Sequence, residues 1–213
     1  MGLRVGENGT VSGIDLSDSM VTLAQRRCAS LAWVDFRVGN ATSLPYADGV
    51  FDVATATQVY NYVSDLSTTL RELYRVLRPA GRALILETDW DTLIWNTSDS
   101  ARMRRILAAW VEHAAHPYLP RTLAPELRNA GFQITEQAVF PLFNPKYDPN
   151  TYSHGLIDFI ASFVTDRQGI TAEEAQAWAN ELRQRGQVDD YFFSLNRYMF
   201  LAVKPEALDS TSS

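Results

Sequence analysis

The chain has 213 residues, 46% of them hydrophobic and 21% charged, which suits one globular domain with a sizeable core. Its net charge is −6 and no basic run occurs, which argues against nucleic acid as a partner. The single cysteine, Cys28, excludes an internal disulfide and a cysteine-based metal site. No apolar run approaches the length of about 18 residues that a membrane span needs. Because the start also lacks the pattern of a secretory signal, we expect a soluble cytoplasmic protein with no membrane partner.

Residues 11–88 alternate strand and helix patterns. An apolar run at 11–14 indicates a short buried parallel strand, and Ser17 then caps a helix that extends to about residue 31. Asp65 caps a second helix, whose leucines recur at helical spacing until Pro79 and Gly81 end it. Further strands are expected at 33–38, 51–57 and 82–88. This alternation predicts an α/β fold with a doubly wound, mostly parallel sheet.

The second half is richer in helices. Helices are expected at 101–115, 124–130, 151–166 and 172–185, and strands at 132–143 and 191–204. Gly131 suits the position after a helix, and Thr171 with Glu174 forms a capping box. We interpret 1–144 and 190–205 as the core domain, 145–189 as an inserted helical cap, and 206–213 as a disordered tail.

Three motifs carry the functional information. The first is Val11-Ser-Gly-Ile-Asp15, a strand pattern that ends in an acid, followed by the helix start Leu16-Ser-Asp-Ser-Met20. The second is Gly39-Asn-Ala-Thr-Ser-Leu-Pro-Tyr46, and the third is Gly49-Val-Phe-Asp-Val53. In an open α/β sheet, an acid at the carboxyl end of a strand is placed to hold two ribose hydroxyls.

The order and spacing of these motifs resemble the class I S-adenosylmethionine (SAM) dependent methyltransferases, especially the branch of quinone-biosynthesis and small-molecule methyltransferases. The resemblance covers residues 5 to about 90 well and the terminal strands more loosely. It implies a Rossmann-like sheet with an antiparallel C-terminal strand and SAM as the cofactor. It also implies cofactor contacts for the ribose, the adenine and the methionine part, from Asp15, Leu16, Met20, Asn40, Ala41, Thr57 and Gln58. Plainer roles stay open: Asp15 as a solvated strand-end acid and Met20 as ordinary helix packing.

Two departures from the family pattern stand out. Asn40 occupies a position where relatives usually carry Asp, so its bond to the adenine amino group loses charge assistance and SAM binding should weaken. The family's first strand and its glycine-rich loop are not found upstream of Val11. We therefore expect an incomplete chain, a noncatalytic remnant, or a site completed by a partner, including a homodimer formed with a second copy.

The expected chemistry is in-line methyl transfer to a small aromatic or apolar acceptor, in which the enzyme aligns the reactants and excludes water. Tyr62 and His113 are the candidate catalytic groups, since an O-methylation needs a base. Tyr62, Trp90 and Tyr198 are the candidate acceptor contacts. No metal site is predicted, although His113 and His116 share one helix face. A truncated, noncatalytic methyltransferase-like protein with a binding or structural role is the alternative, and a nicotinamide enzyme fits the motifs less well.

Overall fold

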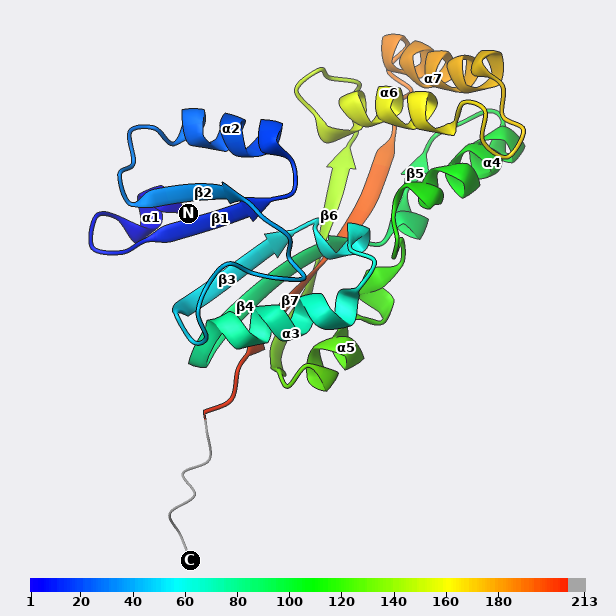
Figure 1. Ribbon diagram of the computed structural model, residues 1–213. Coiled ribbons are helices and arrows are strands. Elements are labelled where there is room, and N and C mark those ends of the chain that lie inside the picture. Colours follow the sequence, from blue (N-terminus) through cyan, green and yellow to red (C-terminus); the bar gives the residue numbers. More distant parts are fainter. Residues whose placement is uncertain (207–213) are drawn as a thin grey trace, which may run out of the picture.

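The computed structural model describes residues 1–206 and contains two sheets (Figure 1). The first pairs β1 (Val11–Asp15) with β2 (Val34–Val38) in parallel. The second has the order β3 (Phe51–Thr57), β4 (Leu77–Thr88), β7 (Phe193–Val203) and β5 (Ile94–Trp95), with β6 (Gln133–Asn144) also paired to β7. β3 and β4 are parallel, whereas β7 is antiparallel to β4, β5 and β6. The predicted α/β fold with an antiparallel C-terminal strand is confirmed.

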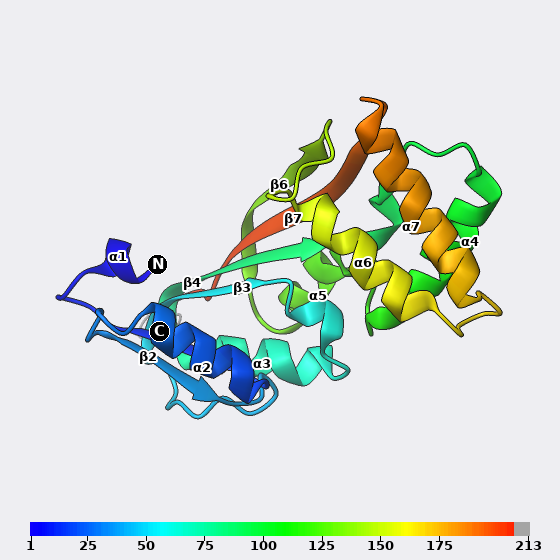
Figure 2. The same cartoon turned by 90° about the horizontal axis from the view of Figure 1, so that it is seen from above.

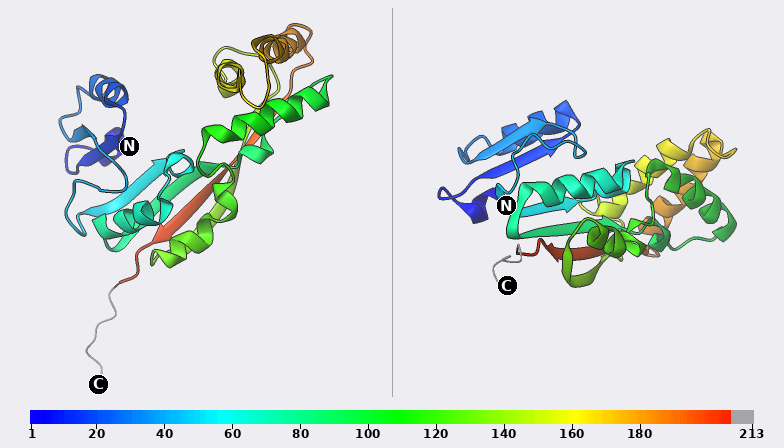
Figure 3. Two further views of the ribbon diagram at one scale, coloured as in Figure 1. Left: turned by 45° about the vertical axis from the view of Figure 1, so that its right-hand side comes forward. Right: turned by 60° about the horizontal axis from the view of Figure 1, so that its bottom comes forward.

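Seven α-helices surround the sheets in the described part of the chain (Figures 2 and 3). They are α1 (Gly2–Val5), α2 (Asp18–Arg27), α3 (Leu66–Val76), α4 (Ser100–Trp110), α5 (Leu123–Asn129), α6 (Tyr152–Val164) and α7 (Ala172–Gln187). Short 3-10 turns lie at Tyr60–Tyr62, Trp90–Thr92, Val111–His113 and Leu119–Arg121. Within residues 1–206, no helix is both long and apolar enough to span a bilayer. The predicted disordered tail, except for Glu206, lies outside the described residues.

Three of the predicted helix caps are confirmed. The side chains of Ser17, Asp65 and Thr171 accept hydrogen bonds from backbone N–H groups in the first turns of α2, α3 and α7. Each bond satisfies a backbone donor that the helix itself leaves without a partner. These helix starts are therefore determined by local chemistry, which a sequence pattern can reveal.

The predicted ends of three helices were wrong. The helix expected at 101–115 ends at Trp110 and is followed by the 3-10 turn Val111–His113, so His113 and His116 do not share a helix face. α2 ends at Arg27, with Cys28 as its C-cap, rather than at about residue 31. α3 ends at Val76 because Leu77 already has extended backbone angles and pairs with Phe51 at the start of β4. Pro79 and Gly81 therefore lie inside this long strand instead of after the helix.

The junction between α3 and β4 is held by specific contacts. The Lys204 ammonium group donates to the carbonyl oxygens of Tyr74 and Leu77 at 2.9 and 2.7 Å, which satisfies acceptors at the helix end. A Cβ atom on Gly81 would lie 2.7 Å from the Arg78 carbonyl oxygen, so the turn needs glycine. Residues far apart in the chain thus decide where the helix stops.

The buried core consists of two clusters, both C-terminal to residue 59. One lies among α4, α6, α7 and the neighbouring strands and includes Trp95, Met103, Ile106, Ile157, Trp178 and Phe193. The other lies between the sheet, α3 and α5 and includes Leu70, Leu77, Ile85, Leu123, Leu127 and Phe200. In residues 1–59, by contrast, Val21 is the only buried side chain. The prediction that 11–14 forms a buried strand was wrong, because β1 has a strand neighbour on one edge only and remains half-buried.

Candidate functional site

A cleft of about 970 Å³ separates the two sheets. It is lined by the facing strands β1 and β3 and by the inner side of α3. Ile14 and Ala56 line the cleft, and each directly precedes a predicted cofactor residue, Asp15 and Thr57. β1 and β3 run in the same direction (Figure 1). Asp15 and Thr57, their last residues, therefore lie at the same end of the cleft. The fold thus brings two distant sequence motifs to the same end of the cleft.

Asp15 is the last residue of β1 and its side chain is exposed. Its Oδ1 accepts a hydrogen bond from the Ser17 backbone N–H at 2.8 Å, and no residue within 1–206 bonds to Oδ2. Two apolar side chains follow in the sequence, Leu16 and Met20, which are 70% and 49% exposed. One carboxylate oxygen beside an uncovered apolar patch is a suitable arrangement for a ribose and its base.

The predicted adenine contacts lie in the loop after β2. Asn40 is exposed, and its Oδ1 accepts the Thr42 backbone N–H at 3.0 Å. An amide oxygen has a second lone pair, so this turn leaves acceptor capacity for a ligand. Ala41 lines the cleft itself.

The loop after β3 is held by a buried acid that the sequence analysis did not identify. Glu87, at the end of β4, is fully buried and accepts hydrogen bonds from the backbone N–H groups of Val59, Tyr60 and Asn61 at 3.1, 2.9 and 3.4 Å. Burial raises the pKa of Glu87 to about 7, although these three donors act in the opposite direction. The available sequence signal was an acid placed directly after the apolar run 83–86.

Gln58 links this loop to the sheet. It has a left-handed backbone φ of 51°, which is unusual for a residue other than glycine. Its side-chain Nε2 donates to the Thr88 hydroxyl at 2.9 Å, and its Oε1 accepts from Arg197 Nη2 at 2.5 Å. These two bonds fix the Gln58 side chain between β3, β4 and β7.

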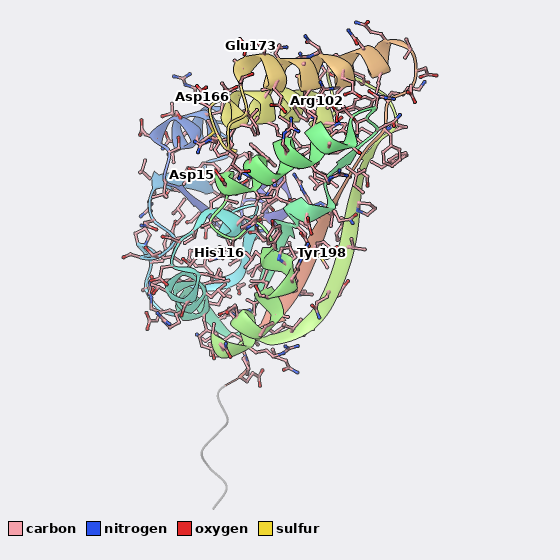
Figure 4. All side chains as sticks on the ribbon, turned by 90° about the vertical axis from the view of Figure 1, so that its right-hand side faces the viewer. Asp15, Arg102, His116, Asp166, Glu173 and Tyr198 are labelled. Atoms are coloured by element: carbon pink, nitrogen blue, oxygen red, sulfur yellow. The ribbon has the colours of Figure 1, made fainter. Side chains whose placement is uncertain are left out.

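A second cavity, of about 420 Å³, follows the carboxyl ends of β3 and β4. Its walls are largely aromatic and include Tyr62, Trp90, Trp110, Tyr152, His154 and Phe159. Of the predicted acceptor contacts, Tyr62 and Trp90 line this cavity. Tyr198 does not, and it packs instead against the cluster under α3 and α5. Figure 4 shows Tyr198 on β7 and Asp15 in the separate β1–β2 part.

His113 lies beside this cavity, with its ring 5.7 Å from that of Tyr62. The ring stacks on Trp110 at 3.7 Å, and its Nδ1 lies 2.5 Å from the Trp110 carbonyl oxygen. A carbonyl can only accept, so Nδ1 carries the proton and Nε2 keeps its lone pair. Nε2 is buried without a partner in residues 1–206, and burial lowers the pKa of His113. The imidazole is thus neutral with an unpaired acceptor nitrogen, but His113 is not among the residues that line the cavity.

Tyr62 differs from His113 in its acid–base state. Burial raises the pKa of Tyr62 to about 12, so its phenol remains protonated at neutral pH. It can therefore donate a hydrogen bond to an acceptor molecule, and unlike His113 it lines the cavity directly.

Other polar residues nearby have structural partners. Asp89 forms an ion pair with Arg121 at 2.7 Å, so its carboxylate is already engaged. The His116 backbone N–H donates to the Asn61 carbonyl oxygen, and the Asn61 amide donates back to the His116 carbonyl oxygen at 2.6 Å. His154 belongs to the first turn of α6, within the helix expected at 151–166. Among residues 1–206, no three His, Cys, Asp or Glu side chains are grouped to hold a metal.

Comparison with known proteins agrees with this arrangement. Residues 3–85 match the family model described as a methyltransferase domain. A demethylmenaquinone methyltransferase of Lactococcus lactis is 30% identical over 149 residues, which cover 62% of this chain and 59% of that protein. An uncharacterized 37.1 kDa protein in transposon TN4556 of Streptomyces fradiae is 36% identical over 135 residues, covering 61% of this chain and 38% of that protein. The chain therefore matches less than two thirds of the length of either relative.

A solved structure shows the same fold at low sequence identity. The SAM-dependent methyltransferase from Methanosarcina mazei superposes with a TM-score of 0.59 at 17% identity, covering 97% of this chain and 88% of that one. Together, these findings show two things: residues 3–85 are similar to a methyltransferase domain, and the chain has the fold of a solved SAM-dependent methyltransferase.

Proposed function

We propose that this protein transfers a methyl group from SAM to a small aromatic or apolar acceptor. The carrying observation is the position of Asp15 at the carboxyl end of β1, at the same end of the cleft as Thr57 and Gln58, which follow the lining residue Ala56 of β3. The family match over residues 3–85 contains all three residues and supports the assignment.

The residues present fit the cofactor. Asp15 would bind the ribose hydroxyls through its available Oδ2, Leu16 and Met20 would pack on the nucleoside, and Asn40 with Ala41 would meet the adenine edge. Thr57 and Gln58 would face the methionine part. Bound SAM supplies an electrophilic methyl group, so the protein's task is to align the acceptor and exclude water.

The aromatic cavity is the proposed acceptor site. Its volume and its apolar walls suit a small planar molecule. His113 Nε2 would accept the proton of an acceptor hydroxyl while Tyr62 donates a hydrogen bond that orients it. Residues 145–189, which contain α6 and α7, act as the cap that selects the acceptor, since α6 contributes Tyr152, His154 and Phe159 to the walls.

Calorimetric titration of SAM and S-adenosylhomocysteine into the folded chain tests this function. We expect saturable binding that weakens by about tenfold or more in Asp15→Ala, since a charge-assisted hydrogen bond is lost. Asp35→Ala is the matched control, because it removes an exposed acid of β2 in the same part of the molecule. A folded chain that binds neither ligand, or an Asp15→Ala variant that binds as well as the wild type, contradicts the proposal. The first of these results would favour a noncatalytic binding or structural role.

Cytoplasmic location, a homodimeric assembly and the absence of nucleic-acid or membrane partners stay predictions. Sedimentation of the purified chain with and without SAM tests the assembly. A monomer that binds SAM would contradict a site that requires a second copy.

A further inference from the structure

A positive charge lies beside the aromatic cavity. Arg197 belongs to β7, where it pairs with Thr88 of β4. Its guanidinium carbon is 4.9 Å from the ring centroid of Tyr152, which lines the cavity. Its charge also acts to lower the pKa of Tyr62, a second lining residue, against the stronger effect of burial. The guanidinium group therefore contacts one lining residue, Tyr152, and its charge acts on a second, Tyr62, although Arg197 itself does not line the cavity.

Two contacts hold this guanidinium group in place. Gln58 accepts a hydrogen bond from its Nη2, and the Tyr152 ring supports it by a cation–π contact. Since Gln58 is itself bonded to Thr88, the guanidinium orientation is set by β3, β4 and α6 together. A preorganised donor of this kind loses little entropy when a ligand binds.

The charge of Arg197 has no carboxylate partner within residues 1–206. Nine other arginines form ion pairs in this part of the chain: Arg37, Arg75, Arg78, Arg102, Arg105, Arg121, Arg167, Arg183 and Arg185. Arg197 is half-buried, and its Nε is buried without a hydrogen-bond partner. Glu87 is near enough for the charge of Arg197 to act to lower its pKa, but the two form no ion pair, and the Glu87 oxygens accept from the backbone of residues 59–61. A partly buried cation with unused donors is satisfied by an anion.

We propose that Arg197 is a specificity-determining residue that binds a carboxylate or similar oxyanion on an aromatic acceptor. The guanidinium fork matches a carboxylate, and the neighbouring aromatic walls accommodate the ring that carries it. This inference rests on the proposed function, in that it takes the aromatic cavity as the acceptor site. The same carboxylate chemistry also exists in the methionine part of SAM, so the test must distinguish these two sources.

The test compares benzoate with benzamide, which share a shape but differ in charge, and needs no SAM. Binding to the full chain is followed by ligand-observed NMR, in the wild type and in Arg197→Met, which keeps an unbranched apolar stem. We expect benzoate to bind the wild type about tenfold more tightly than benzamide, as a charged hydrogen bond implies. Arg197→Met should abolish this preference by weakening benzoate binding, with benzamide binding unchanged. Arg82→Met, an exposed position on β4, is the matched control and should keep the preference.

A second arm assigns the source of the carboxylate. S-adenosylhomocysteine carries the methionine carboxylate, and 5′-methylthioadenosine lacks it. If Arg197→Met weakens S-adenosylhomocysteine alone and leaves benzoate binding intact, the anion belongs to the cofactor and the proposal is wrong. Equal binding of benzoate and benzamide to the wild type, or no binding of either, overturns it as well. Because benzoate is measured without SAM, a failure of cofactor binding is recognised separately.

Discussion

The part of the molecule up to residue 59 and the part that follows differ in how much side chain they bury. The first contains α1, β1, α2, β2 and β3, and Val21 is its only buried residue. The second contains both hydrophobic clusters and the aromatic cavity. Most of the proposed cofactor contacts thus lie in the part with few buried side chains. The proposed acceptor contacts lie in the part that contains the hydrophobic clusters. Cofactor binding and global stability should therefore respond to different substitutions.

The physical reason is the pairing of the strands. In residues 1–206, β1 pairs only with β2 and β3 only with β4, so the edges that face the cleft carry unpaired backbone groups. A two-stranded sheet is only marginally stable by itself. We expect the β1–β2 part to open locally before the rest unfolds, which amide hydrogen exchange can detect.

The largest effect on stability should come from a substitution in the hydrophobic clusters that follow residue 59. Trp178 is fully buried in the cluster of α4, α6 and α7, and its indole Nε1 donates to the Met103 sulfur at 3.2 Å. Trp178→Ala should lower the free energy of unfolding by about 3–5 kcal/mol, through lost burial and a cavity. Val21→Ala should cost only about 1 kcal/mol in the same urea titration. Equal costs for the two variants would contradict the proposed contrast between the regions.

A substitution beside the cavity should change rate rather than stability. His113→Asn keeps a donor near the Trp110 carbonyl oxygen but removes the Nε2 acceptor, so turnover of a hydroxyl acceptor should fall by about 100-fold. Affinity for SAM should be unchanged, because the cofactor contacts lie elsewhere. In the wild type the lowered pKa of His113 keeps the imidazole neutral, so the rate should persist below pH 6.5, its ordinary pKa. His116→Asn is the control, and an equal loss there would argue against a base at His113.

Glu87 links stability to pH. Its pKa is raised in the folded protein, from 4.5 to about 7, so folding favours the protonated form. Its stabilising contribution is fully present below pH 4.5 and is lost as the pH rises through about 7. Glu87→Gln should remove this dependence, so the difference in unfolding free energy between wild type and variant should shift by on the order of 2 kcal/mol between pH 4.5 and 8. A wild type that instead gains stability relative to the variant over this range would show that the three backbone donors keep Glu87 ionised.

The smallest effect, on SAM affinity, is expected from a substitution in residues 1–59, where few side chains are buried. Asn40→Asp keeps the oxygen that accepts the Thr42 N–H and adds charge assistance to the adenine contact. SAM should bind about fivefold more tightly, as measured by calorimetry. Unchanged or weaker binding would indicate that Asn40 does not meet the adenine amino group.

Local features of this protein follow from its sequence alone. The caps at Ser17, Asp65 and Thr171 and the strand at Phe51–Thr57 depend on neighbouring residues, and so does the acid at the end of β1. Their hydrogen bonds and side-chain periodicity span only a few positions. This is why the sequence alone predicts the doubly wound fold and the resemblance to methyltransferases.

The tertiary structure decided the features that depend on distant partners. Leu77 became the first residue of a strand because Phe51 pairs with it, and Glu87 became significant because the backbone of residues 59–61 turns onto it. The aromatic cavity unites side chains from Tyr62 to Phe159, nearly 100 positions apart. Likewise, Arg197 becomes a candidate anion-binding residue only because it has no ion-pair partner in residues 1–206 and lies over the Tyr152 ring. Burial and charge balance are properties of three-dimensional neighbours, and no spacing along the chain encodes them.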